Sequence, residues 1–209
     1  MLIAGSTTVV LRGSTMANIV PRWEWRTFGE SFGEADVKFA ALTPSDVQET
    51  DELYFLSSGN NENVKVRFDL MDIKTLVEVN ADGLEQWKPV MKAKFPLPAD
   101  EVKEVLAALG VAVTSMAREN YTLDEFTSEL GQPSGLRAVK VHKKRTRYKI
   151  NGCTSEMTEV LADGRKTRTV ALELEDAARV IATVRELGLH QFPNISYPRG
   201  LKQLVGMKG

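Results

Sequence analysis

Cysteine and histidine are scarce in this sequence. The single cysteine, Cys153, rules out an intramolecular disulfide and nearly excludes a zinc site built from thiolates. The two histidines, His142 and His190, are too far apart in the sequence to predict a metal pair, so we expect surface or capping roles for both. This cysteine usage favours a reducing cytoplasm, in which Cys153 is a structural thiol.

Long hydrophobic runs and the common nucleotide and protease motifs are also missing. The weakly apolar run within residues 1–20 lacks a basic leader and is too short to span a bilayer. We therefore expect a disordered leader over residues 1–20, one domain over residues 21–209, and no association with a membrane. The sequence contains neither a GxxxxGK[ST] phosphate loop nor an HExxH pair, which removes the P-loop and zinc-protease classes.

Net charge is nearly absent as well. The 27 basic and 28 acidic residues give a formal charge of -1, which argues against a protein that wraps duplex nucleic acid by bulk electrostatics. Hydrophobic residues make up 43% and charged residues 26%, as in an ordinary soluble globular chain, so only the arrangement of the charges can indicate function. The oligomeric state stays open, and a homodimer is one possibility.

Segments of alternating side chains dominate what the sequence does contain. We expect strands over residues 21–28, 52–57, 63–70, 118–126, 137–150, 154–161 and 166–175, and two more carrying Lys74 and Trp87. Helices are predicted over residues 32–42, 101–109, 176–187 and 201–205, with turn and capping residues at 43–51. Hairpin signals at 80–83 and 151–152 join neighbouring strands. This order predicts an α+β fold: a closed antiparallel β-barrel with helices packed outside.

Charged side chains occupy alternate positions on several of these strands. The cations of this set are Arg22, Arg26, Lys65, Arg67, Lys74, Lys143, Arg145 and Arg147, and the carboxylates are Glu24, Glu156, Glu173 and Glu175. One interpretation is that each strand simply has one solvated face. The opposite faces also need burial, because they carry Trp23, Trp25, Val64, Val66, Leu172 and Leu174. We therefore expect helices to cover the outside and the charged set to face the barrel lumen.

A lumen of this composition suits a polyphosphate. Arginine and lysine bind phosphate oxygens, while carboxylates hold a hard divalent ion, for which Mg²⁺ or Mn²⁺ is the natural choice. Hydrolysis then depends on positioning, charge neutralisation and an activated water. We predict that all eight cations bind substrate, that Glu24, Glu173 and Glu175 are catalytic, and that the metal ligands are Glu24, Glu156, Glu173 and Glu175.

Several segments together resemble the CYTH domain, the triphosphate tunnel metalloenzyme superfamily. The resemblance runs from about Trp23 to the tail and rests on RWEWR, DELYF, VKVR, KKRTRY, SEMTEV with ADG, and VALELE. It implies a closed eight-stranded antiparallel tunnel that binds a triphosphate with a divalent metal. Members of that superfamily include inorganic, thiamine and RNA triphosphatases and one class of adenylyl cyclase.

The first strand departs from the pattern of that family, which reads ExExK. By strand phase the equivalent positions are Arg22, Glu24 and Arg26, so an arginine stands where the first glutamate is expected. A guanidinium cannot ligate a metal. Three hypotheses stay open: a metal-dependent triphosphate hydrolase, a module that binds polyphosphate or a nucleotide without turnover, and a structural or oligomerisation domain whose charges are only solvated.

Overall fold

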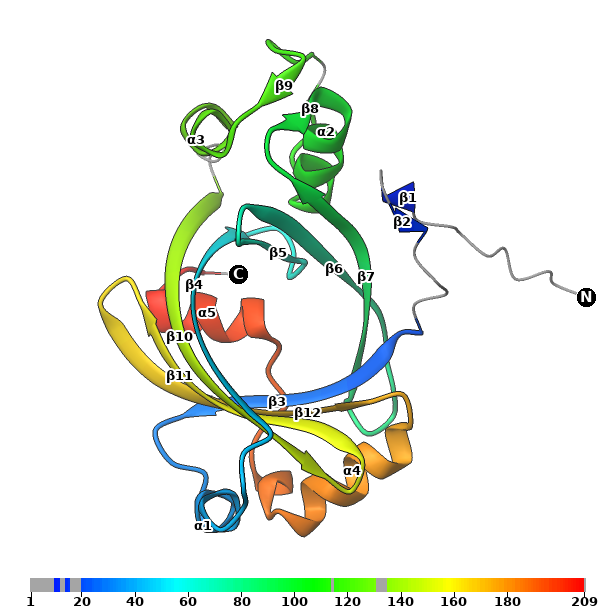
Figure 1. The fold of residues 1–209 in the computed structure, drawn as a ribbon, viewed down its shortest axis with the longest axis vertical. Helices are drawn as coiled ribbons and strands as arrows, with labels where there is room; N and C mark the ends of the chain where they lie inside the picture. Colours follow the sequence, from blue (N-terminus) through cyan, green and yellow to red (C-terminus); the bar gives the residue numbers. More distant parts are fainter. Residues whose placement is uncertain (1–9, 12–13, 16–19, 114, 131–134, 209) are drawn as a thin grey trace, which may run out of the picture.

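A closed barrel of eight antiparallel strands forms the centre of the computed structural model (Figure 1). The structure describes residues 10–11, 14–15, 20–113, 115–130 and 135–208. The strands follow one another around the barrel as β10-β11-β12-β3-β7-β6-β5-β4. Their bounds are β3 Arg22–Gly29, β4 Asp46–Ser57, β5 Asn63–Arg67, β6 Leu70–Val79, β7 Glu85–Lys94, β10 Leu136–Ile150, β11 Cys153–Ala162 and β12 Arg165–Leu174. The predicted closed eight-stranded barrel is confirmed.

Two short sheets are separate from the barrel sheet. One pairs β1, Val10–Leu11, with β2, Ser14–Thr15, and the other pairs β8, Leu97–Pro98, with β9, Asn120–Tyr121. The predicted disordered leader, residues 1–20, lies outside the described residues except for β1, β2 and Val20.

The long strand β10 sets the register of its side of the barrel. It pairs with β11 through the predicted Asn151–Gly152 turn, where both residues have positive φ, 52° and 82°. On its other side it pairs with twelve residues of β4. The prediction of turn and capping residues over 43–51 is wrong for Asp46–Asp51. Each of these residues pairs with a residue in the second half of β10, so they form the first half of β4.

Two further local predictions are wrong. The predicted strand 63–70 is interrupted at Phe68 and Asp69, whose φ values of 53° and 59° turn the chain back into β6. Of the predicted strand 118–126, only β9 is extended. The Thr122 hydroxyl accepts from the Glu125 backbone and the Glu125 carboxylate accepts from the Thr122 backbone, a capping box that starts α3, Leu123–Glu125. The π-helix η1, Phe126–Leu130, follows directly.

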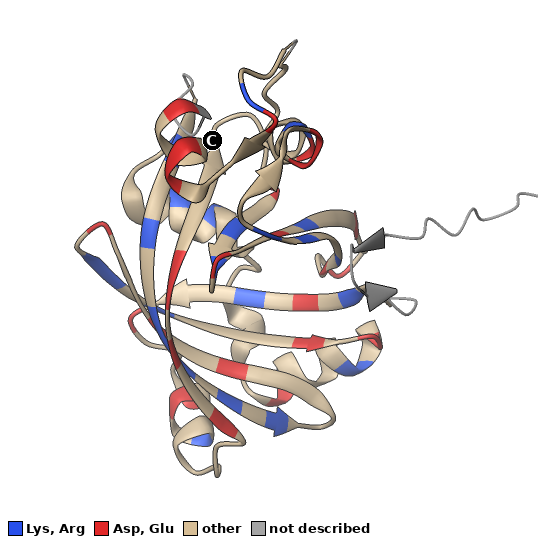
Figure 2. Ribbon diagram, turned by 45° about the horizontal axis from the view of Figure 1, so that its top comes forward, with Lys and Arg blue, Asp and Glu red and all other residues tan. Residues whose placement is uncertain are grey.

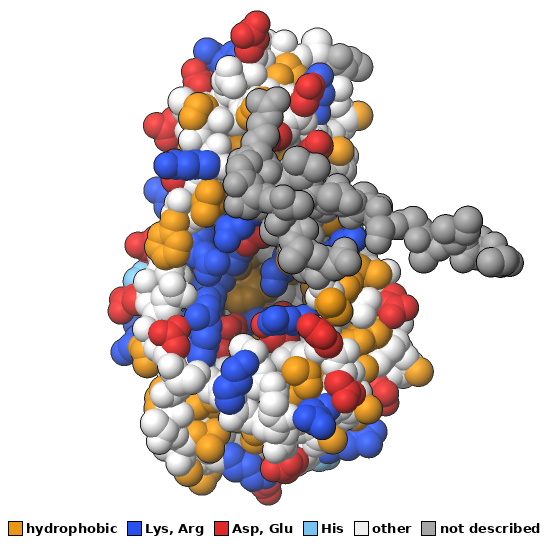
Figure 3. Space-filling view, turned by 45° about the vertical axis from the view of Figure 1, so that its right-hand side comes forward, with side chains coloured by type: hydrophobic (Ala, Val, Ile, Leu, Met, Phe, Trp, Pro, Cys, Tyr) orange, Lys and Arg blue, Asp and Glu red, His pale blue; other side chains and the backbone are white. Residues whose placement is uncertain are grey.

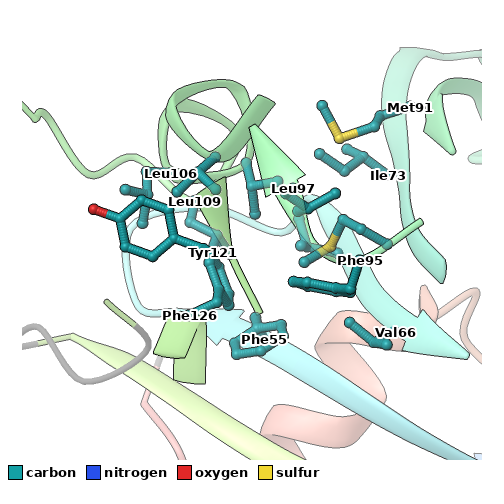
Figure 4. Close-up of a cluster of buried hydrophobic side chains, with 14 residues drawn as sticks. Phe55, Val66, Ile73, Met91, Phe95, Leu97, Leu106, Leu109, Tyr121 and Phe126 are labelled. Carbon is teal, nitrogen blue, oxygen red and sulfur yellow. The ribbon is translucent and has the colours of Figure 1, made fainter. Parts of the chain in front are cut away.

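Helices cover the apolar outer faces of the barrel strands. Helices α1, Glu34–Ala40, and α4, Ala177–Glu186, lie over β3 and β12, where Trp25 and Leu172 are buried. Helix α2, Ala99–Ala108, covers the other side, where Val66 and Ile73 pack near Leu106 and Phe126 (Figure 4). The 3-10 helix η2, Leu189–Gln191, follows α4. Across the described residues, no helix combines the length and apolarity needed to span a bilayer.

The last helix, α5, Tyr197–Val205, fills one end of the barrel lumen. Its Tyr197, Leu201 and Val205 pack against side chains that share the inward phase of their strands: Tyr54, Leu56, Val139, Val141, Val160 and Ala162. The ring of Tyr197 stacks on that of Tyr54, with centroids 5.3 Å apart. Helix α5 begins four residues before the predicted segment 201–205, and it leaves the charged part of the lumen open toward the other end.

Candidate functional site

A polar cavity of about 420 Å³ occupies the lumen of the barrel, and we call it the lumen cavity (Figure 3). Nine cationic side chains line it: Arg22, Arg26, Lys65, Arg67, Lys74, Lys143, Arg145, Arg147 and Lys149. Four carboxylates share the lining: Glu24, Asp72, Glu156 and Glu173. All eight cations predicted from the sequence to bind substrate therefore reach the same cavity.

Strand alternation delivers these side chains to the lumen. On β3, Arg22, Glu24 and Arg26 line the cavity, while Trp25 between them is buried in the outer apolar cluster. On β10, Lys143, Arg145 and Arg147 line it in the same way. Figure 2 shows basic and acidic positions interspersed along several barrel strands. Because neighbouring strands pair in antiparallel register, residues that lie far apart in the sequence, such as Glu24 and Glu173, lie side by side on the lumen wall.

The deepest charged group is centred on Glu52, whose side chain is completely buried. Its carboxylate oxygens lie 2.9 Å from Lys143 Nζ, 3.1 Å from Lys65 Nζ, 3.6 Å from an Arg145 nitrogen and 3.8 Å from an Arg67 nitrogen. Burial alone raises the pKa of the Glu52 carboxyl, but Lys143 and Lys65 outweigh burial and hold that pKa below its usual value. One permanent anion is therefore surrounded by four cations.

Lys143 is the most buried of these cations, with a side chain only 1% exposed. Its Nζ donates a hydrogen bond to the Tyr54 hydroxyl at 2.6 Å and lies 3.8 Å from the centre of the Tyr197 ring. Burial, followed by the neighbouring charge of Lys65, lowers the pKa of Lys143 well below its usual value, although Glu52 opposes the shift. Four basic side chains surround one carboxylate in this group, and an additional anion beside Lys143 would oppose the lowering of its pKa.

A second group is centred on Arg26. Its Nε donates to Glu24 at 2.8 Å and its Nη2 donates to Glu156 at 3.0 Å, while Arg145 Nε lies 3.1 Å from the other oxygen of Glu156. Burial lowers the pKa of Arg26, but Glu24 and Glu156 more than compensate and raise it. Burial raises the pKa of Glu156, whereas Arg26 and Arg145 bring it down to about 2. Glu156 is thus ionised, and both carboxylates are already paired with arginine.

The outer part of the lumen cavity carries more exposed pairs. Arg22 lies 3.1 Å from Glu173, and Arg147 lies 2.8 Å from Asp46 on β4. The side chain of Arg22 is 53% exposed, so water screens its pair with Glu173. Lys74 has no hydrogen bond or ion pair within the described part of the chain. These outer cations are therefore accessible to a ligand that enters from solvent.

The predicted metal ligands do not form a preformed metal site. Among the residues that the structure describes, no group of three or more His, Cys, Asp or Glu side chains is placed to hold an ion. Glu24 and Glu156 share Arg26, and Glu173 is held by Arg22. A carboxylate that accepts charge-assisted hydrogen bonds from guanidinium must give them up before it can bind Mg²⁺ or Mn²⁺. This donor set does not fit a divalent ion.

Three of the four predicted carboxylates line the lumen cavity, and Glu175 does not. Strand β12 ends at Leu174, and Glu175 lies at the bend that follows, exposed to solvent. The next residue, Asp176, caps α4 by accepting a hydrogen bond from the Arg179 backbone.

Sequence analysis also missed lumen residues, namely Ser45, Glu52, Tyr54, Asn63, Asp72, Tyr148, Lys149, Thr154, Ala171 and Tyr197.

His142 lies on the outside of the barrel, as expected for a surface residue. Its ring nitrogens lie 2.8 Å from Asp51 and 2.9 Å from Glu49, and hydrogen bonding to Asp51 is the first cause of a raised His142 pKa. Cys153 is buried, and burial raises the pKa of its thiol, as expected for a structural thiol.

Comparison with solved structures gives the fold a precedent. A protein from Hippeastrum, provisionally assigned as an adenylyl cyclase and described as having a dominant triphosphatase activity, matches with a TM-score of 0.51 at 13% identity, over 90% of this chain and 97% of that one. A conserved hypothetical protein from Pyrococcus furiosus matches with a TM-score of 0.47 at 16% identity, over 84% and 98% of the two chains. A provisionally assigned adenylate cyclase from Bacillus halodurans matches with a TM-score of 0.46 at 11% identity, over 86% and 97%. No family model and no curated protein matches the sequence.

Proposed function

Because the chain has a CYTH-like tunnel fold, we propose that its lumen cavity binds a small molecule that carries a triphosphate or polyphosphate chain. The observation that carries this proposal is the lining of the cavity, in which nine cations accompany four carboxylates. Arginine and lysine donate short, charge-assisted hydrogen bonds to phosphate oxygens. The triphosphatase activity described for the Hippeastrum protein supports a triphosphate as the ligand.

The cationic side chains lie at different depths in the lumen cavity, which supports a ligand with several anionic groups along a chain. Arg22 is half exposed, Arg26 and Arg145 are 8% exposed, and Lys143 is almost completely buried. A phosphate chain that enters from solvent would meet cations at each of these depths. The cavity volume of about 420 Å³ lies in the range of small-molecule sites.

The same burial argues against a structural domain whose charges are only solvated. Taking a charged lysine or arginine out of water is costly, so a solvated face would keep these side chains exposed. Lys143, Arg26 and Arg145 are instead buried together in the lumen. Such a desolvation cost is expected where the buried charged side chains bind a ligand.

Metal-dependent hydrolysis of the bound triphosphate, with Mg²⁺ or Mn²⁺, is the second candidate. It is favoured by the placement of three carboxylates on neighbouring strands: Glu24 on β3 lies directly opposite Glu173 on β12, and Glu156 lies on β11 beside β12. For this candidate, the carboxylates must break their hydrogen bonds with the arginines before they can bind a metal ion. Cyclisation of a nucleoside triphosphate, suggested by the assignment of the Hippeastrum protein, has the same requirement.

Ligand binding and phosphate release from the same protein preparation test the two candidates. Tripolyphosphate, ATP and thiamine triphosphate are added separately, with orthophosphate and sulfate as controls. We expect tripolyphosphate to raise the melting temperature, since a ligand that binds only the folded state stabilises it. Release of orthophosphate with Mg²⁺ or Mn²⁺ would establish the second candidate. If none of the three compounds changes the melting temperature or is hydrolysed, the proposed function is wrong.

A further inference from the structure

We infer that the lumen cavity takes its phosphate ligand in the metal-free form, because Arg22 and Arg26 already occupy the carboxylates that would otherwise hold a divalent ion. This inference rests on the proposed binding function and is incompatible with metal-dependent hydrolysis, the second candidate. It specifies the ionic form of the ligand, which the fold alone does not indicate.

The first step of the argument is the position of Arg26. Its guanidinium bridges Glu24 and Glu156, which come from β3 and β11, the two strands that flank β12. The space between these two carboxylates is therefore filled by a guanidinium. With a side chain only 8% exposed, Arg26 is held inside the lumen and cannot simply swing into solvent.

The second step is the pairing of the remaining carboxylate. Glu173 stands directly opposite Glu24 in the β3–β12 register, and it accepts a hydrogen bond from Arg22 at 3.1 Å. Each of the three carboxylates that these strands direct into the lumen cavity is therefore paired with a guanidinium. A divalent ion entering here would lie beside Arg26 in a region of low dielectric, where like charges repel strongly.

The third step concerns the cations that are not needed for these pairs. Lys65, Lys143 and Arg67 share the single carboxylate of Glu52, and Lys74 has no ionic partner in the described residues. This surplus positive charge can neutralise a phosphate chain directly. A divalent ion on the ligand cancels part of the negative charge that these side chains attract, so it should weaken binding.

Calorimetric titration of the protein with tripolyphosphate tests the inference in two buffers, one with EDTA and one with Mg²⁺ in excess over the ligand. We expect binding in EDTA, and affinity about tenfold weaker with Mg²⁺, as partial neutralisation of the ligand predicts. Binding that requires Mg²⁺ would overturn the inference while leaving the proposed binding function intact. Absence of binding in both buffers would instead contradict the proposed function itself.

A reversal of charge at Arg22 provides a second test with a different readout. In Arg22→Glu, Glu173 loses its guanidinium partner and gains a neighbouring carboxylate at the outer part of the lumen cavity, so we expect the variant to bind Mn²⁺ more tightly than wild type in an electron paramagnetic resonance titration. Arg185→Glu is the matched control, because it makes the same change of charge on the exposed side of α4. Wild-type protein that binds Mn²⁺ and loses it in Glu24→Gln would overturn the inference, as would an Arg22→Glu variant without increased Mn²⁺ affinity.

Discussion

Arg26 donates hydrogen bonds to Glu24 at 2.8 Å and to Glu156 at 3.0 Å from one buried guanidinium. The same guanidinium also donates a hydrogen bond from Nη1 to the hydroxyl of Thr169 on β12, at 3.3 Å. One side chain of β3 therefore connects the lumen faces of β12 and β11. Ion pairs of this kind link neighbouring strands inside the lumen cavity.

Loss of the Arg26 guanidinium should destabilise the protein strongly. Arg26→Gln leaves Glu24 without its buried partner and Glu156 with Arg145 alone, and breaking a buried pair costs about 3 kcal/mol. Arg22→Gln is the control, because its pair with Glu173 is half exposed and should contribute less than about 1 kcal/mol. Urea denaturation of both variants measures the two losses. Equal losses would contradict a structural role for the buried bridge.

Stability should fall in acid because Glu156 is ionised in the folded protein. Its pKa is lowered from 4.5 to about 2, so the unfolded chain binds the proton more readily than the folded one. The contribution of Glu156 is complete above pH 4.5 and is lost as the pH falls toward about 2. Melting temperatures of wild type and Glu156→Gln across this interval should converge. Parallel curves would show that Glu156 does not titrate as described.

Lys74 should contribute to ligand binding at little cost to stability. It lines the lumen cavity and has no hydrogen bond or ion pair among the described residues, so its removal breaks nothing in the unliganded protein. We expect Lys74→Gln to bind tripolyphosphate about fivefold more weakly and with a smaller dependence on salt. Lys166→Gln removes the same charge from an exposed position outside the lumen cavity and is the control. Equal affinities for the two variants would place the ligand elsewhere.

Gly200 should be intolerant of alanine although it lies within a helix. A Cβ at this position would collide with the ring of Phe28, whose strand β3 faces α5. Alanine normally stabilises a helix by up to about 1 kcal/mol relative to glycine, whereas overpacking costs about 1–3 kcal/mol. We expect Gly200→Ala to lower stability in thermal denaturation, and the loss to shrink when Phe28→Ala makes room. A Gly200→Ala variant more stable than wild type would contradict the packing of α5 in the lumen.

The barrel and its charged lumen could be predicted because alternation on β3 and β5 is clear. In these strands one face is mostly apolar and the other charged, so the phase of Arg26 and Lys65 follows from the sequence. On β10 the phase of Lys143 rests on its shared spacing with Arg145 and Arg147, because the outer face of that strand is polar as well. Glu52 could not be placed in this way. Strand β4 buries Tyr54 and Leu56 against α5 inside the barrel and Phe55 in the outer core, so both of its faces are apolar and its phase is hidden.

Predictions also failed where local hydrogen bonds or pairing partners decide the backbone. The turn at Phe68 and Asp69 has no glycine to reveal it, and the capping box of Thr122 and Glu125 converts an apparent strand into a helix. The pairing of carboxylates with arginines was missed for another reason. Alternation places a side chain on a face, but only the register between β3, β12 and β11 brings Arg26 to Glu156.

A crystal structure of the protein grown with saturating tripolyphosphate in EDTA tests the central claim most directly. We predict that the anion lies in the lumen cavity, with phosphate oxygens within hydrogen-bond distance of Lys65, Lys143 or Arg145 and with the bridge from Arg26 to Glu24 and Glu156 intact. An anion bound only on the outer surface, or an empty lumen at a concentration that saturates binding in solution, would contradict the account.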